Sequence, residues 1–197
     1  MSVPAIPSAL ERALSTRAGR DLIKQFAEKT GCEADLRTFI RTAWPILHPG
    51  QPYLHNWHID LIAEYLMAID AGELKRVIFN IPPRFMKSIE ITVMWPVWSW
   101  IHRPESSWQF WSYSSDLMTT HSLNRRTIVE SEWYQGLWGD RVTLAGDENR
   151  KQIFMNERRG VMDATRSKTG KGGNRLVIDD PVDPEDALSP TTRNGAN

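Results

Sequence analysis

Two short, mainly apolar segments of the chain, residues 76–81 and 175–180, each end abruptly in residues that can carry chemistry. The first segment runs into a pair of prolines, and the second ends in Asp179 and Asp180. Apolar runs of this length with β-branched residues and a sharp end are typical of buried strands in a parallel sheet. Open α/β sheets bind ligands beyond the carboxyl ends of their strands, so the residues after each segment are the first candidates for a functional site.

Helical patterns separate these strand-like segments. Asn56 is expected to cap a helix that Gly72 ends, Ser114 or Ser115 is expected to cap another, and Pro96 is expected to kink a third. Helices are therefore expected at residues 21–29, 57–69, 87–101 and 116–130, and further strands at residues 107–113, 141–145 and 152–156. This alternation predicts an α/β fold with a mainly parallel sheet.

Composition narrows the class of protein. The length of 197 residues fits one compact domain. The 24 Lys and Arg residues balance the 24 Asp and Glu residues, which excludes an overall positive charge that would attract nucleic acid or membranes. The single cysteine, Cys32, excludes a disulfide framework or a cysteine-based zinc site and fits a reducing compartment. The chain shows neither a signal-like start nor an unbroken apolar span, so we expect a cytosolic protein. Most of the nine tryptophans are expected in the core.

The charge is unevenly distributed although its sum is zero. Acidic residues dominate after Leu176, whereas the preceding stretch, residues 150–175, is mainly basic. Its basic residues are Arg150, Lys151, Arg158, Arg159, Arg166, Lys168, Lys171 and Arg175. Two interpretations stay open, an ordinary solvated surface or a basic loop beside an acidic, metal-binding strand end.

Residues 80–88, Asn-Ile-Pro-Pro-Arg-Phe-Met-Lys-Ser, lie between an expected strand and an expected helix, where a phosphate-binding loop belongs. Lys87 and Ser88 occupy the positions of a lysine that neutralises phosphate oxygens and a hydroxyl that ligates Mg²⁺. Ile81 and Met86 replace both glycines of the usual pattern. Glycine easily adopts backbone shapes that cost a residue with a side chain about 1–3 kcal/mol. The alternative interpretation of the Lys-Ser pair is a simple helix start.

The acidic end of the second strand-like segment is a candidate metal site. A carboxylate after an apolar strand, here Asp179, is suited to hold Mg²⁺ through water, and Asp180 is suited to orient an attacking water. An Asp-Pro turn alone would also explain these residues. Neither pattern is specific by itself, but their order along the chain indicates a nucleotide-binding site.

A wider set of motifs resembles the N-terminal ATPase half of the large terminase subunit of tailed bacteriophages and prophages. The motifs are Trp57-His-Ile-Asp60, Asn80-Ile-Pro-Pro-Arg-Phe-Met-Lys-Ser88, Trp111-Ser-Tyr-Ser-Ser-Asp-Leu117, Glu130-Ser-Glu-Trp-Tyr134, Trp138-Gly-Asp140, Thr169-Gly-Lys-Gly-Gly173 and Val177-Ile-Asp-Asp-Pro181. The resemblance covers residues 45–190, with residues 1–44 as N-terminal lead-in helices and residues 191–197 as a polar tail. It implies a three-layer P-loop NTPase fold of the additional-strand type, incomplete at its C-terminus and without the family's nuclease domain.

The resemblance implies that ATP and Mg²⁺ are the cofactors and that both bind at the two segments. Arg84, Lys87 and Ser88 become the Walker A side chains, and Ser88 and Asp179 become the Mg²⁺ ligands. The further ATP contacts implied are Pro83, Phe85, Met86 and Trp57, with Trp57 stacked on adenine. For catalysis, it implies Asp180 as the acid that orients water.

Glu185 is the alternative for this acid, and Arg84 or an arginine of a neighbouring subunit is the implied arginine finger. The implied function is ATP-driven packaging of viral DNA into procapsids in the host bacterial cytoplasm. The implied partners are double-stranded viral DNA, the small terminase subunit, the portal of the procapsid and further copies of this chain in a ring. No membrane is involved.

Two other hypotheses stay open. A truncated or degenerate prophage remnant would keep the fold without hydrolysing ATP, and both Met86 and the missing nuclease half favour it. A different P-loop enzyme, such as a helicase core, fits the tryptophan-rich segments less well.

Overall fold

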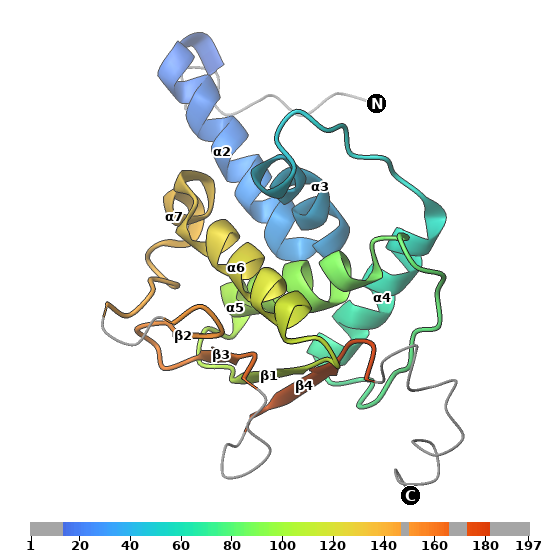
Figure 1. The fold of residues 1–197 in the computed structure, drawn as a ribbon. Coiled ribbons are helices and arrows are strands. Elements are labelled where there is room, and N and C mark those ends of the chain that lie inside the picture. The colour runs from blue at the N-terminus through green and yellow to red at the C-terminus, as the bar shows by residue number, and fades with distance from the viewer. Residues whose placement is uncertain (1–13, 147–149, 166–172, 182–197) are drawn as a thin grey trace, which may run out of the picture.

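The computed structural model describes residues 14–146, 150–165 and 173–181 (Figure 1). Its helices are α2 (Arg17–Ala34), α3 (Leu36–Leu47), α4 (Trp57–Ala71), α5 (Trp95–His102), α6 (Ser115–Glu130) and α7 (Glu132–Trp138). A π-helical segment, η1 (Ile89–Met94), leads directly into α5. The strands are β1 (Trp108–Trp111), β2 (Ile153–Met155), β3 (Val161–Asp163) and β4 (Arg175–Ile178).

The described strands form one small mixed sheet in the order β2-β3-β1-β4. β1 pairs in parallel with both β3 and β4, whereas β2 pairs with β3 in the antiparallel direction. Helices α5 and α6 lie over one face of this sheet, and α3 packs on these helices on the side away from the strands (Figure 1). The expected α/β class is therefore confirmed.

Strand β4 shows which face of the sheet meets the helices. Val177 is buried, whereas its neighbours Leu176 and Ile178 are 55% and 52% exposed. Successive side chains of a strand point to opposite faces, so the second face is open at this edge. At β4, the described residues therefore form two layers, the sheet and the helices on one of its faces. Three layers were expected.

The prediction of a strand at residues 76–81 is wrong. These residues are extended, but they pair with no described strand, and Ile78 is 86% exposed. Phe79 packs edge-to-face on Tyr65 of α4, with ring centroids 6.2 Å apart. A short apolar run signals burial without saying against which element, and here part of the run packs on a helix.

The expected pairing of residues 141–145 with residues 152–156 is reduced to one antiparallel bridge, between Leu144 and Asn156. The main partner of β2 is β3, which the sequence analysis missed because it is only three residues long. The turn between them needs Gly160, because a Cβ atom there would meet the carbonyl oxygen of Pro104.

Two expected helices and their caps are confirmed. The Asn56 side chain accepts a hydrogen bond from the Trp57 amide at the start of α4, and Gly72 ends that helix with a φ of 84°. Ser114 caps α6 by accepting from the Leu117 amide. The helix expected at residues 21–29 is longer, and α3 is a further helix whose bounds were not expected, although lead-in helices were expected at residues 1–44.

Helix α3 joins the N-terminal part of the chain to the core. Asp35 caps it by accepting hydrogen bonds from the amides of Arg37 and Thr38. Its buried residues are Leu36, Phe39, Ile40 and Ala43, which belong to the main hydrophobic cluster. The helix continues through Pro45 and so spans the boundary expected between residues 44 and 45.

The irregularity expected at Pro96 lies instead in the preceding turns, which form η1. Pro96 has no N–H to donate to the carbonyl of Thr92, four residues earlier. The guanidinium of Arg125 supplies this hydrogen bond, with its Nη1 2.7 Å from the Thr92 oxygen. Arg125 is fully buried and stacks 3.6 Å over the Phe110 ring, and burial lowers its pKa to about 9. A buried arginine of α6 thus holds the helix that begins at Lys87.

Most of the tryptophans lie in the core, as expected. Five are buried, Trp95, Trp98, Trp100, Trp108 and Trp138. Trp57 and Trp111 are instead 71% and 39% exposed. No helix within the described ranges is both long and apolar enough to cross a membrane.

A buried carboxylate fixes the start of β4 against the helices. Asp70 of α4 accepts hydrogen bonds from Ser99 and Arg103, and it pairs with Arg175 at 3.0 Å. The Arg175 guanidinium also lies 5.3 Å from the Trp108 ring centroid. Arg175 therefore has a structural role and is not available to contact phosphate, although it belongs to the basic stretch.

Candidate functional site

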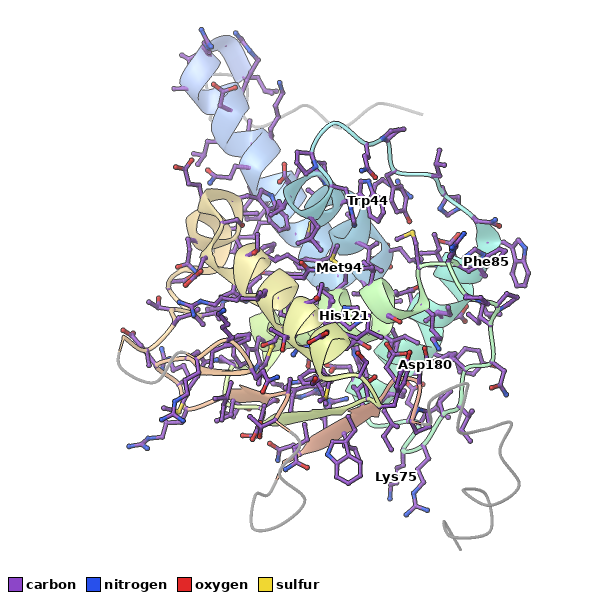
Figure 2. All side chains as sticks on the ribbon, in the orientation of Figure 1. Trp44, Lys75, Phe85, Met94, His121 and Asp180 are labelled. Carbon is purple, nitrogen blue, oxygen red and sulfur yellow. The ribbon has the colours of Figure 1, made fainter. Side chains whose placement is uncertain are left out.

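The two segments singled out from the sequence meet in space. Lys87, in the first helical turn after the proline pair, donates a hydrogen bond of 2.8 Å to Oδ1 of Asp180. The same ammonium lies 3.3 Å from Oδ1 of Asp179. Both aspartates directly follow β4, and Figure 2 labels Asp180 at this edge of the sheet. The lysine and the two carboxylates form the centre of the candidate site.

The lysine is held in its charged form. Partial burial of Lys87 works against the charge, but the hydrogen bond to Asp180 and the negative charge of Asp179 outweigh it. The pKa of Lys87 is therefore raised above its ordinary value. The Asp179 side chain is 12% exposed and that of Asp180 is 56% exposed, so the pair presents one sheltered and one open carboxylate.

The sheltered carboxylate has two more polar neighbours that the sequence analysis missed. The hydroxyl of Thr92 lies 3.5 Å from Asp179 Oδ2, and Nε2 of His121 lies 3.8 Å from the same oxygen. Burial lowers the pKa of His121, although the charge of Asp179 opposes this and that of Arg125 adds to it. The one signal for His121 in the sequence is that a polar residue stands at a core-facing position of the helix that became α6.

The loop before Lys87 has the backbone shape that favours glycine. Met86 has a φ of 61° and Arg84 a φ of 70°, both in the left-handed region. Asp180, on the opposite side of the site, also has a positive φ, of 46°. A residue with a side chain held in such a region costs about 1–3 kcal/mol, and such residues gather at functional sites.

The site residues fit an Mg²⁺ ion that binds together with phosphates. Within the described ranges, no three His, Cys, Asp or Glu side chains gather closely enough to hold a metal ion by themselves. Mg²⁺ is commonly held by one or two carboxylates plus substrate phosphates and water. Asp179 supplies such a carboxylate, and Ser88 follows Lys87 directly at the start of η1. The donor set thus suits a metal carried by a nucleotide.

Exposed aromatic side chains border the loop. Phe85 is 44% exposed, and its ring lies edge-on to His58, with centroids 5.4 Å apart. Nε2 of His58 lies 3.2 Å from the Phe85 carbonyl oxygen, which ties the loop to the start of α4. Trp57 precedes His58 at the start of α4, and its ring lies 6.1 Å from that of His58. The Trp57 side chain is 71% exposed, and its expected contact with adenine stays a prediction.

Some expected residues lie outside the described residues. Glu185 and the loop at residues 166–172 are among them. Of the basic stretch, the described residues with exposed side chains are Arg150, Lys151, Arg158 and Arg159. Pro83 and Arg84 belong to the exposed part of the loop before Lys87.

Comparison of this chain with protein-family models, with curated proteins and with solved structures finds no match.

A buried carboxylic acid next to the site makes the stability of the folded chain depend on pH. Glu90 of η1 is fully buried, and neither of its oxygens has a hydrogen-bond partner among the described residues. Burial, with a smaller contribution from the charge of Asp60, raises its pKa from 4.5 to about 9. The folded chain therefore retains a proton that the unfolded chain loses, so its stability falls as the pH rises through this range.

We expect Glu90→Gln to increase the free energy of unfolding at about pH 8 by roughly 1–3 kcal/mol and to flatten its pH dependence. Urea unfolding at several pH values measures this. Glu64→Gln, an exposed change on α4, is the control. A Glu90→Gln protein whose stability still falls with pH as in the wild type would contradict the assignment of the buried proton.

Proposed function

We propose that this chain is the ATPase region of a terminase-like motor that packages double-stranded viral DNA. The observation that carries the proposal is the contact of Lys87 with Asp179 and Asp180. A lysine at the start of a helix and two acids at the end of a parallel strand are the parts that P-loop ATPases bring together around a nucleotide. The sequence predicted each part separately, and their distances support a common site.

The arrangement supports a P-loop fold although residues 76–81 pair with no described strand. Just before this segment, Arg175 at the start of β4 donates a hydrogen bond to the carbonyl of Ile69. Just after it, Lys87 contacts the aspartates at the end of β4. The helices on either side of the segment thus contact the two ends of β4, which supports the proposal.

In the proposed reaction, the chain's residues bind ATP, orient water and stabilise charge. Lys87 would leave the aspartates to neutralise the phosphate oxygens, and Ser88 and Asp179 would hold Mg²⁺. The metal would supply positive charge against the phosphates. Asp180, the more exposed acid, would orient the attacking water and accept its proton. The water oxygen would bond to the γ-phosphorus while the bond to the β-phosphate oxygen breaks, which leaves ADP and phosphate. Arg84, or an arginine of a neighbouring subunit, adds charge stabilisation.

The proposal extends to the partners. Trp57 provides an exposed ring for stacking on adenine. The exposed Arg150, Lys151, Arg158 and Arg159 near β2 and β3 suit phosphate groups of DNA. We include the small terminase subunit, the procapsid portal and a ring of copies as the assembly in which the region works.

A second candidate function is a remnant that binds nucleotide without hydrolysing it. The left-handed backbone of Met86 favours this candidate, because a residue with a side chain holds this conformation at a cost that glycine avoids.

Release of phosphate from ATP by the full chain tests the proposal. We expect release that requires Mg²⁺ and that falls at least about 100-fold in Asp179→Asn, because the variant loses the sheltered carboxylate. Asp140→Asn, an exposed acid away from the site, should keep the wild-type rate. Mg²⁺-independent release, or equal rates in both variants, would contradict the proposal, and nucleotide binding without release would favour the remnant.

A further inference from the structure

We propose that His121 is a positioning residue that holds the Asp179 carboxylate in the orientation needed to ligate Mg²⁺. The inference rests on the proposed function and adds a residue of α6 to the site. In the sequence, His121 is distant from both Lys87 and Asp179. Figure 2 labels it near the centre of the molecule.

The two oxygens of Asp179 face different surroundings. Oδ1 faces the Lys87 ammonium at 3.3 Å, on the side where a nucleotide would enter. Oδ2 faces inward, 3.5 Å from the Thr92 hydroxyl and 3.8 Å from His121 Nε2. A nucleotide that draws Lys87 away would release Oδ1, whereas the inward contacts of Oδ2 would remain. Thr92 and His121 can therefore keep the carboxylate aimed while its other oxygen changes partner.

The burial of His121 points to a role in the site. His121 is 9% exposed, and its Nδ1 is buried without a hydrogen-bond partner among the described residues. A buried polar group without a partner lowers stability, so an apolar residue at this core-facing position would be the better choice for packing alone. Among the described residues, the ring forms an ion-pair contact with the carboxylate of Asp179.

The inward contacts belong to a rigid support. Arg125, one turn further along α6, donates to the carbonyl of Thr92 and stacks on Phe110 of β1. Helix α6 thus fixes the backbone of Thr92 with one side chain and approaches Asp179 with another. Its two side chains connect η1, which begins two residues after Lys87, to the aspartates that follow β4.

The distance of 3.8 Å exceeds a hydrogen bond, and a shift of less than about 1 Å would form one. Contacts in a ligand-free site are often longer than in the complex. Residues behind a metal ligand orient it, and their loss typically costs about 10–100-fold in metal affinity or activity. We expect an effect of this size from His121.

The test measures the affinity of the full chain for ADP by calorimetry, once with Mg²⁺ and once with a chelator. The ratio of the two affinities is the gain due to the metal. We expect His121→Phe to keep the wild-type affinity in chelator and to lower the gain about 10–100-fold. His121→Gln should recover most of the gain, because its amide N–H can reach the carboxylate in place of Nε2.

His48→Phe is the matched control, because His48 also has a buried and unpartnered ring nitrogen but stacks on Trp44 instead. It should leave the gain unchanged. A wild-type gain in His121→Phe, or no recovery in His121→Gln, would overturn the positioning role alone. A wild-type protein that binds ADP with no gain from Mg²⁺, or does not bind it, would overturn both this inference and the proposed function.

Discussion

Lys87→Ala is expected to lower the affinity of the chain for Mg-ATP, and its rate of hydrolysis, by at least about 100-fold. Lys87 is the one cation within 4 Å of both Asp179 and Asp180 among the described residues. Without it, two carboxylates face the triphosphate, and their repulsion adds to the lost attraction. Calorimetric titration with Mg-ATP and a phosphate-release assay measure the two effects.

The same variant should bind a divalent cation alone more tightly than the wild type does. In the structure, the ammonium occupies the face of the aspartates that a metal would approach. Weaker binding of Mg-ATP together with tighter binding of Mn²⁺ would indicate a local change at the site. Unfolding would instead abolish the binding of both ligands. Lys75→Ala, an exposed lysine (Figure 2), is the control and should change neither. Wild-type affinity for Mg-ATP in Lys87→Ala would contradict the assignment of the site.

Met86→Gly is expected to raise the affinity for Mg-ATP about tenfold and to increase turnover. Met86 has a φ of 61°, a conformation that glycine adopts without strain. Relief of about 1–3 kcal/mol corresponds to a factor of roughly 5 to 160 in an equilibrium, and part of it is lost to the greater flexibility of the glycine. Titration and turnover under the same conditions measure both gains.

Phe85→Gly is the matched control for this variant. It places a glycine one residue earlier in the same loop, where the backbone φ is not positive. It should gain no affinity, because it relieves no strain. Equal effects of the two glycines would indicate loop flexibility, and a loss of affinity in Met86→Gly would show that the methionine itself contributes to binding.

The central pair of the site could be predicted from local sequence alone. Lys87 follows a proline-rich turn at a helix start, and Asp179 ends an apolar strand, so both have signals within a few residues. The residues that support them have no such signal. Thr92, His121 and Arg125 lie inside helices, and their roles depend on how α6 packs over η1. Such contacts across elements cannot be inferred from spacing.

The errors in the predicted strands have a related cause. A local pattern reports which side chains are apolar, but strand pairing depends on a partner elsewhere in the chain. The run at residues 76–81 is apolar because Phe79 packs on α4, and it forms no ladder. β3 was missed because its three residues carry too little pattern, and Gly160 shapes the turn before it.

Calorimetric titration of the full wild-type chain with ATP, in Mg²⁺ and in chelator, tests the central claim most directly. We expect saturable binding of one nucleotide per chain that requires Mg²⁺ and that Lys87→Ala abolishes. The absence of binding in both the wild type and Met86→Gly would contradict a nucleotide site at Lys87, Asp179 and Asp180.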